Sequence, residues 1–395
     1  MKSVEKGYLE SKHKTILFIL DAALADWKGT QRFIYGLGKY LTSHSYNVVV
    51  IENTSRYMSE KQVPDHREIP FKVISCRFRR FLGVGFVPKK EIFSVDPDVI
   101  YVCFLNSNPF VPTLGYKTVL GSHILHLSFL KYASTRHKIN FWVKSLILTG
   151  IALVFWGNKK IYFHALTEDQ QNWISAKTNR RYPIFTIGNP VECCNKDEID
   201  MINYDVSKKF KILFFGSFSK DKGFDRFLQI LEIIESSSLG REIDFIIAGA
   251  GELIKDINVP MGKYRNIKFI DRPTDEQKYQ LFHCSDLLVY PSLMDIYPFT
   301  LAEAQIHGLP VIAADTIKGS GIVIDGQTGY ILSQNSIDEF ISRIDYYYGI
   351  WKSSTEDYYN LRMEIIRKSK RLCEQNILPR YFSLFESVLT DDRGT

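Results

Sequence analysis

Short runs of consecutive apolar residues alternate along this chain with stretches in which apolar residues recur at helical spacing. Residues 14–21 form the first run, and Phe33, Ile34, Leu37 and Leu41 then mark one face of a predicted helix. The same pattern predicts further strands at 47–53, 71–76, 98–104 and 161–167. Strands that alternate with helices in this way predict a parallel sheet with crossover helices.

A second series of apolar runs predicts strands at 211–216, 243–249, 267–270, 286–291 and 310–314. The chain has 395 residues, which is more than one hydrophobic core usually serves. We therefore expect an α/β protein with two doubly wound, Rossmann-like domains, at 1–192 and 210–370, joined by the polar linker 193–209. Ligands of such sheets are expected at the carboxyl ends of the strands.

Composition bears on the compartment and on the partner. The six cysteines form no CxxC pair and no metal-ligand spacing with histidine, which is typical of reduced thiols in a cytoplasmic protein. The first fourteen residues are mostly polar or charged, so we expect no signal peptide. Basic residues exceed acidic ones in the first half, and no acidic residue occurs between Asp98 and Glu168. This charge segregation predicts an anionic partner.

Two stretches of the first half combine basic and apolar residues. Residues 141–156 are almost uniformly apolar, but the run is shorter than the ~20 residues that cross a bilayer. Because tryptophans and cations flank this run within 131–160, it is typical of a segment seated at a membrane interface, and 77–90 repeats the pattern. We expect both stretches to contact an anionic membrane surface; the alternative is a core helix with a basic loop. No nucleic-acid-binding motif accompanies the charge, so we expect no nucleic acid partner.

The most informative chemistry lies in residues 291–315, where two carboxylates, Asp295 and Glu303, flank the start of a predicted helix. Pro298 suits the first helical position, and Gly308 suits the helix end. The backbone N–H groups of Phe299, Thr300 and Leu301 then point at the mouth of the loop, where the helix dipole favours an anion. Two hydroxyl-accepting carboxylates beside an anion site suit a sugar linked to phosphate. A surface helix with solvated acids is the alternative.

These residues resemble the carboxy-terminal domain of the family-4 retaining glycosyltransferases of the GT-B fold, whose hallmark is two acidic residues separated by seven. The resemblance continues, in the family's order, through residues 214–224, 246–252, 267–292 and 325–332. It implies two Rossmann-like domains that face each other across a cleft, with a last helix within 371–395 that crosses back to the first domain.

The resemblance also implies roles for individual residues of the second domain. Lys222, in the loop that begins at Gly216, matches the lysine that binds the donor phosphates, whereas Ser217 replaces a usual arginine. Glu303 matches the carboxylate that holds the ribose. Asp295 matches the one that contacts the donor sugar, although the family residue there is usually glutamate. The base of the nucleotide is expected near 271–274, a segment that includes Arg272.

In the first domain the resemblance is sparser. Gly29 and Thr30 match the acceptor-side glycine loop, and His123 matches a histidine near the reaction centre; a packed or capping histidine is the alternative. The residues Asp96 and Asp98 form a DxD pattern, but the neighbouring proline is typical of a turn and the GT-B resemblance implies no metal. No GxGxxG fingerprint or Walker motif supports a dehydrogenase or a P-loop enzyme.

Together these patterns predict a metal-independent retaining glycosyltransferase at the inner face of a membrane, with catalytic residues Asp295, His123 and Lys222. Its donor is expected to be a nucleoside diphosphate sugar, with UDP or GDP as the nucleotide and no separate cofactor, and its acceptor a glycan or a lipid-linked glycan. Two alternatives remain: a nucleotide-sugar epimerase on the same fold, and an inactive protein that binds sugar nucleotides or membranes.

Overall fold

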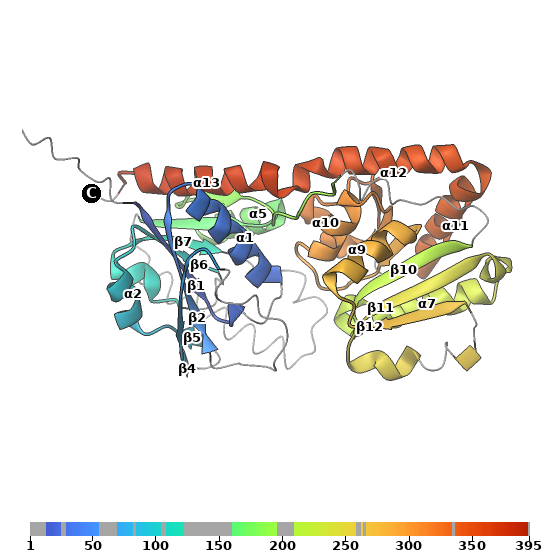
Figure 1. Cartoon of the computed structure of the whole chain (residues 1–395), viewed down its shortest axis with the longest axis horizontal. Helices are drawn as coiled ribbons and strands as arrows, with labels where there is room; N and C mark the ends of the chain where they lie inside the picture. Colours follow the sequence, from blue (N-terminus) through green and yellow to red (C-terminus); the bar gives the residue numbers. More distant parts are fainter. Residues whose placement is uncertain are drawn as a thin grey trace, which may run out of the picture.

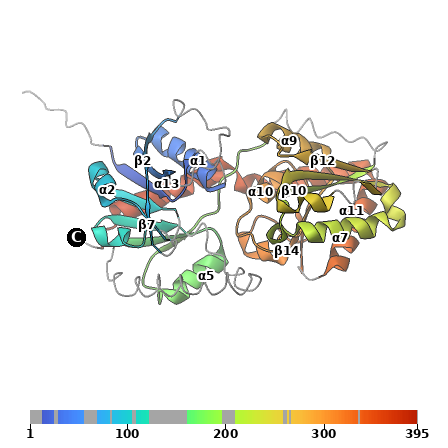
Figure 2. The ribbon, with the colours of Figure 1, turned by 90° about the horizontal axis from the view of Figure 1, so that it is seen from below.

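The computed structural model describes residues 13–24, 29–54, 69–81, 84–103, 108–121, 160–195, 209–257, 262–263, 266–333 and 336–393. These residues form two α/β domains that lie side by side (Figures 1 and 2). The predicted fold class of two doubly wound domains is confirmed. The calls on His123, on 131–159 and on parts of 77–90 lie outside the described residues.

The first domain contains a parallel sheet with the order β3-β2-β1-β6-β7-β8-β9. Its strands are β1 (Thr15–Leu20), β2 (Asn47–Asn53), β3 (Lys72–Cys76), β6 (Val99–Val102), β7 (Lys117–Gly121), β8 (Ile161–Ala165) and β9 (Ile184–Thr186). All six residues of β1 are buried, because β1 lies between β2 and β6 in the sheet centre. This double burial is why its sequence is continuously apolar instead of alternating.

Helices cover both faces of this sheet. They are α1 (Gly29–Ser43), α2 (Lys89–Val95), the 3₁₀ turn η4 (Val111–Leu114) and α5 (Glu168–Lys177), and β4 (Arg79–Phe81) forms an antiparallel hairpin with β5 (Val84–Phe86). The residues Phe33, Ile34, Leu37 and Leu41 of α1 are buried in one core, whereas α2 and α5 contribute to the core on the other face.

The second domain contains a parallel sheet with the order β12-β11-β10-β13-β14-β15. Its strands are β10 (Phe210–Ser217), β11 (Ile243–Ala250), β12 (Ile267–Asp271), β13 (Leu287–Tyr290), β14 (Val311–Ala314) and β15 (Gly329–Leu332). Its helices are α7 (Phe224–Glu235), α9 (Asp275–Cys284), α10 (Phe299–Ile306), α11 (Ile337–Ser353) and α12 (Thr355–Ser369), and its 3₁₀ turns are η5 (Lys220–Lys222), η6 (Ser238–Arg241), η7 (Glu252–Ile257), η8 (Asp315–Ser320) and η9 (Lys370–Leu372). The chain reverses direction across the sheet between β10 and β13, which is the switch point where such sheets bind ligands.

The last helix, α13 (Glu374–Thr390), belongs to the first domain. Figure 1 shows α12 over the second domain and α13 continuing over the first. The buried residues Tyr381 and Phe385 of α13 lie in the same core as β1 and α1. The two places where the chain passes between the domains are joined, because the Val191 N–H donates to the Leu372 carbonyl and the Glu374 N–H donates to the Val191 carbonyl.

Two further properties bear on the sequence expectations. All six cysteines are free thiols. Among the helices that the structure describes, none combines the length and the apolar character that crossing a bilayer requires.

Candidate active site

The loops that follow β10 and β13 bring Lys222 and Asp295 together at the switch point. The Lys222 ammonium lies 2.6 Å and 2.8 Å from the two carboxylate oxygens of Asp295. The hydroxyls of Tyr290 and Ser292 also donate to Asp295 Oδ2, at 2.5 Å and 2.7 Å. Burial, and then the Asp295 charge, raise the pKa of Tyr290 well above its ordinary value, so this phenol stays a hydrogen-bond donor. Two expected site residues thus form one preorganised charge pair.

Glycines let the backbone around this pair pack closely. Gly223, which follows Lys222, has a φ of +68°, and a Cβ atom there would lie 2.0 Å from the Pro291 carbonyl oxygen. Gly249 has a φ of +147°, and its Cβ would lie 1.8 Å from the Gly216 carbonyl oxygen. A Cβ on Gly216 itself would meet no heavy atom within 4 Å. The loop after β10 is therefore fixed at its base and has open space beside Gly216, where Ser217 is exposed.

The helix α10 begins one residue later than the sequence predicted. Pro298 is the residue before the first turn and has an extended ψ of 120°, and the helix runs from Phe299 to Ile306. Pro298 offers no side-chain cap, so the amides of Phe299, Thr300 and Leu301 keep the polarity of a helix amino-terminus. An anion that binds beside Lys222 would meet this second source of positive potential.

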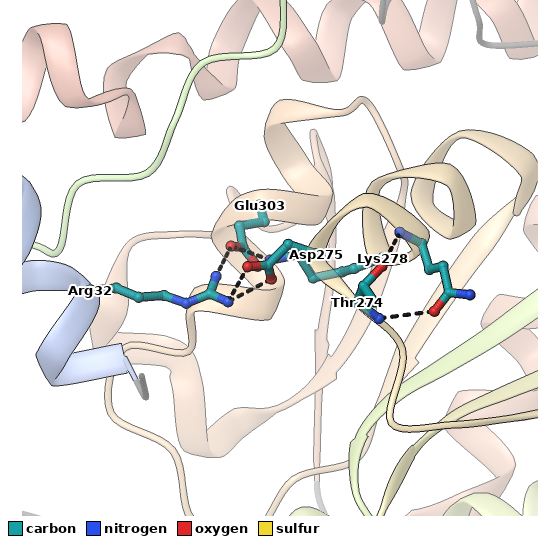
Figure 3. Close-up of polar contacts among 6 residues, drawn as sticks. Arg32, Thr274, Asp275, Lys278 and Glu303 are labelled. Carbon is teal, nitrogen blue, oxygen red and sulfur yellow. Dashed lines mark hydrogen bonds and ion pairs between the residues drawn. The ribbon is translucent and has the colours of Figure 1, made fainter. Parts of the chain in front are cut away.

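Glu303 lies inside α10 and is buried in a cluster of charged side chains (Figure 3). Its carboxylate oxygen Oε1 lies 2.6 Å from the Lys278 ammonium of α9 and 3.5 Å from the Arg32 guanidinium. Arg32 also binds both carboxylate oxygens of Asp275, at 2.5 Å and 2.7 Å, and Lys278 lies 3.3 Å from Asp275. Because Arg32 belongs to α1, this cluster joins the two domains.

Burial and charge oppose each other in this cluster. Burial raises the pKa of Glu303, although the neighbouring Lys278 and Arg32 act in the opposite direction. For Asp275, burial also acts to raise the pKa, but the hydrogen bond from Arg32 and the charge of Lys278 outweigh it and lower the pKa. The two cations therefore keep two closely spaced carboxylates available as hydrogen-bond acceptors.

The first turn of α1 touches the first turn of α10. A Cβ atom on Gly29 would lie 2.8 Å from the ring of Phe299, and that ring packs against the cores of both domains. Thr30 is half-buried beside this contact. Gly29 and Thr30, expected on the acceptor side, are thus at the domain boundary next to α10.

Arg272 takes a different position from the other expected site residues. Its backbone is left-handed, with a φ of 44°, and its N–H donates to the Gly249 carbonyl. Its side chain is largely exposed and lies 3.7 Å from the neighbouring Asp271. Arg272 therefore fixes the loop after β12 through its backbone, and its side chain joins neither the Lys222 pair nor the Glu303 cluster.

Sequence reasoning missed Arg32, Asp275, Lys278, Tyr290 and Ser292. Lys278 has only 5% of its side chain exposed, although a lysine in a helix is normally expected at the surface. Only Arg32 could have been suspected from the sequence, because it lies three residues after Gly29, which the resemblance placed on the acceptor side.

Among the described residues, Cys194, His283 and His307 place their donor atoms within 4.8 Å of one another. The ligand atoms of a tetrahedral zinc site lie roughly 3.3–3.8 Å apart, so Cys194 would have to move closer to complete one. As they stand, the two imidazoles share a 2.8 Å hydrogen bond, and burial lowers the pKa of His307 to about 3. This cluster is a hydrogen-bonded pair of imidazoles beside a thiol.

The hairpin region of the expected membrane surface is partly internal. Val87 is buried, and Phe86 stacks on Phe110 with 6.1 Å between the ring centroids. Val87 therefore packs in the core of the first domain. Arg77 and Arg79 remain exposed.

Comparisons with known proteins agree with this fold. Residues 195–365 match the family model of the glycosyl transferases group 1. This segment belongs to that family. The chain is 23% identical over 199 residues to an uncharacterized 41.2 kDa protein of the cps region of Klebsiella pneumoniae, a match that covers 50% of each chain. It is 30% identical over 115 residues to an Escherichia coli UDP-Gal:alpha-D-GlcNAc-diphosphoundecaprenol alpha-1,3-galactosyltransferase, covering 28% of this chain and 29% of that protein.

These two matches span half or less of each curated relative. The solved structures extend the likeness to nearly the whole chain. The structure of Anabaena HepE in complex with UDP superposes with a TM-score of 0.71 at 15% identity, covering 94% of this chain and 100% of that one. At this identity the likeness shows the fold, and the fold is the GT-B arrangement of two Rossmann-like domains.

Proposed function

We propose that this protein transfers a sugar from a nucleoside diphosphate sugar to a glycan or lipid-linked acceptor, with retention of anomeric configuration, in the assembly of a cell-surface polysaccharide, glycolipid or glycoprotein glycan. The observation that carries the proposal is the Lys222–Asp295 pair at the switch point, directly before the helix that holds Glu303. A cation, a helix amino-terminus and two carboxylates there suit a diphosphate flanked by two sugar rings.

Lys222 can serve the donor phosphates without leaving Asp295. An ammonium has three hydrogen-bond donors, and the Asp295 carboxylate engages it at 2.6 Å and 2.8 Å, which leaves donor capacity for a phosphate oxygen. Asp295 keeps lone pairs for a donor-sugar hydroxyl, and Glu303 accepts hydrogen bonds from the ribose. The amides of Phe299 to Leu301 then stabilise the charge that develops on the leaving diphosphate.

In the reaction, the acceptor oxygen forms a bond to the anomeric carbon while the bond from that carbon to the phosphate oxygen breaks. The acceptor proton passes to the departing phosphate oxygen on the same face, and the nucleoside diphosphate leaves. No protein nucleophile is assigned.

Two similar proteins support particular candidates for the donor nucleotide and the acceptor. UDP is the first candidate, because the HepE structure holds UDP and the E. coli relative uses a UDP sugar according to its name. GDP is the second candidate. The same relative's diphosphoundecaprenol acceptor supports a lipid-linked acceptor and a site of action at the inner face of a membrane.

The test is a donor screen in which the protein, UDP or GDP sugars and a membrane extract are incubated together and the products are identified by mass spectrometry. We expect a glycosylated product whose anomeric configuration by NMR equals that of the donor. Lys222→Ala should abolish transfer, whereas Lys220→Ala, an exposed lysine of the same loop, should not. An inverted product contradicts retention, and an epimer formed from donor alone indicates an epimerase. Tight nucleotide binding without any transfer indicates an inactive binding protein.

The membrane proposal has a separate test. Flotation with anionic and neutral vesicles should show binding that depends on lipid charge and that weakens when Arg77 and Arg79 are replaced by alanine. Equal flotation with both vesicle types would overturn it.

A further inference from the structure

Arg32 is the single residue of the first domain among the described ion-pair partners of the Glu303 cluster. Figure 3 shows it reaching from α1 toward Asp275 and Glu303. One terminal nitrogen of its guanidinium, Nη2, contacts both oxygens of Asp275, and the other, Nη1, points to Glu303, so one side chain serves both carboxylates. The side chain is 27% exposed, so the bridge is partly shielded from water.

The charges of this cluster balance only when Arg32 is present. The second domain contributes two carboxylates, Asp275 and Glu303, which lie 3.3 Å and 2.6 Å from one cation, the Lys278 ammonium. On its own it therefore presents one excess negative charge beside the expected nucleotide site. A nucleoside diphosphate is itself anionic, so this excess charge opposes its binding.

A steric contact fixes how closely α1 can approach. One turn before Arg32, Gly29 rests on the Phe299 ring, where a Cβ atom would lie 2.8 Å from that ring. The Arg32–Glu303 ion pair and this contact join the same two helices, α1 and α10, whereas the Arg32–Asp275 ion pair joins α1 to α9. The pieces of chain that connect the domains are hydrogen-bonded at Val191 and Leu372, and Arg32 and Gly29 supply contacts at the boundary between α1 and the second domain.

We propose that Arg32 is a positioning residue that couples the approach of the two domains to donor binding, by cancelling the excess negative charge of the Asp275–Lys278–Glu303 group when α1 closes on α10. The proposal rests on the proposed function, because it takes the nucleotide to bind beside Glu303. Donor binding and domain approach then favour each other: a bound diphosphate adds negative charge that attracts Arg32, and Arg32 in place cancels the charge that opposes the diphosphate.

The test measures UDP and GDP binding by titration calorimetry. Arg32→Ala should weaken binding about tenfold at low salt, with a smaller effect at high salt, because one unit charge near a diphosphate is partly screened. The affinity of Arg32→Lys should lie between those of the wild type and Arg32→Ala, because lysine keeps the charge and loses the guanidinium contacts with both carboxylates. Arg367→Ala is the matched control, because it also removes an arginine that binds both oxygens of a carboxylate, Glu364, within one helix of the second domain.

The double variant Arg32→Ala/Asp275→Ala separates charge balance from simple damage. It leaves Lys278 opposite Glu303 alone, so we expect it to recover most of the lost affinity. An affinity as weak as that of Arg32→Ala, or an Arg32→Ala variant that binds like the Arg367→Ala control, would overturn the proposal. Failure of the wild-type protein to bind either nucleotide would instead count against the proposed function.

A second readout concerns the domains themselves. Small-angle X-ray scattering should show that UDP reduces the radius of gyration of the wild-type protein and of Arg367→Ala, but not of Arg32→Ala. An equal reduction in all three would show that domain approach does not depend on Arg32.

Discussion

Glu303→Gln is the substitution that tests the charge cluster most directly, because it removes one charge and keeps the side-chain shape. The Lys278 ammonium lies 2.6 Å from Glu303, and their side chains are only 5% and 9% exposed. At an effective dielectric constant of about 20, the attraction at that separation is roughly 6 kcal/mol, most of which offsets the cost of removing two ions from water.

Breaking a buried pair from one side typically costs about 3–5 kcal/mol, because the remaining ion is left buried. Here Asp275 still lies 3.3 Å from the Lys278 ammonium. We therefore expect a smaller loss, about 2–3 kcal/mol, confined to the second domain. Native-state hydrogen exchange of peptides from α9 and α10 measures this loss locally, and peptides from β1 provide the internal reference.

Glu364→Gln is the control, since it removes the same charge from an exposed pair with Arg367 and should change little. A loss below about 1 kcal/mol for Glu303→Gln would refute the reasoning. It would mean that Asp275 alone satisfies Lys278, or that water reaches the cluster.

Three further predictions follow from single residues. His164 is fully buried between hydrogen-bond partners, and burial lowers its pKa to about 4 from an ordinary value near 6.5. As the pH falls, the unfolded chain therefore takes up a proton before the folded protein does. The contribution of His164 to the free energy of unfolding should be complete above pH ~6.5 and should fall by up to about 3 kcal/mol as the pH drops toward 4. The urea midpoint of His164→Gln should depend less on pH than that of the wild type, and an equal dependence would contradict the assignment. Gly29→Ala should weaken UDP binding by forcing α1 away from Phe299, whereas Gly36→Ala, where a Cβ meets nothing within 4 Å, should raise the melting temperature because alanine favours helix. Gly223→Ala should cost at least about 2 kcal/mol in thermal or urea unfolding, because its left-handed backbone and the 2.0 Å contact with the carbonyl after β13 exclude a side chain; wild-type stability would show that the loop can rearrange.

Much of the fold could be predicted from the sequence because parallel strands at a sheet centre are buried on both faces. Such strands are continuous apolar runs, and β1, β2 and β10 were placed within a residue or two of their observed bounds. The strands β7, β9 and β15 and the β4–β5 hairpin went unpredicted; β9 and β15 are edge strands, and brief edge or hairpin strands carry little periodic signal.

The candidate site divides in the same way. Asp295, Lys222 and Glu303 were predicted from the sequence because they lie in local motifs with a characteristic spacing. Their partners were not: Arg32 is 271 residues from Glu303, and Lys278 has the appearance of an ordinary exposed helical lysine. Only the packing of α1 against α9 and α10 decides which cation neutralises which carboxylate.

The sequence by itself determined the two parallel sheets and the loop-helix units at their carboxyl ends, because local periodicity and backbone requirements depend on neighbouring residues. The tertiary structure alone decided that α13 completes the core of the first domain, that Lys222 pairs with Asp295 and that Arg32 closes a charge cluster across the domain boundary. The physical reason is that Coulomb interactions and burial depend on distance in space, and the identity of a distant partner leaves no local pattern along the chain.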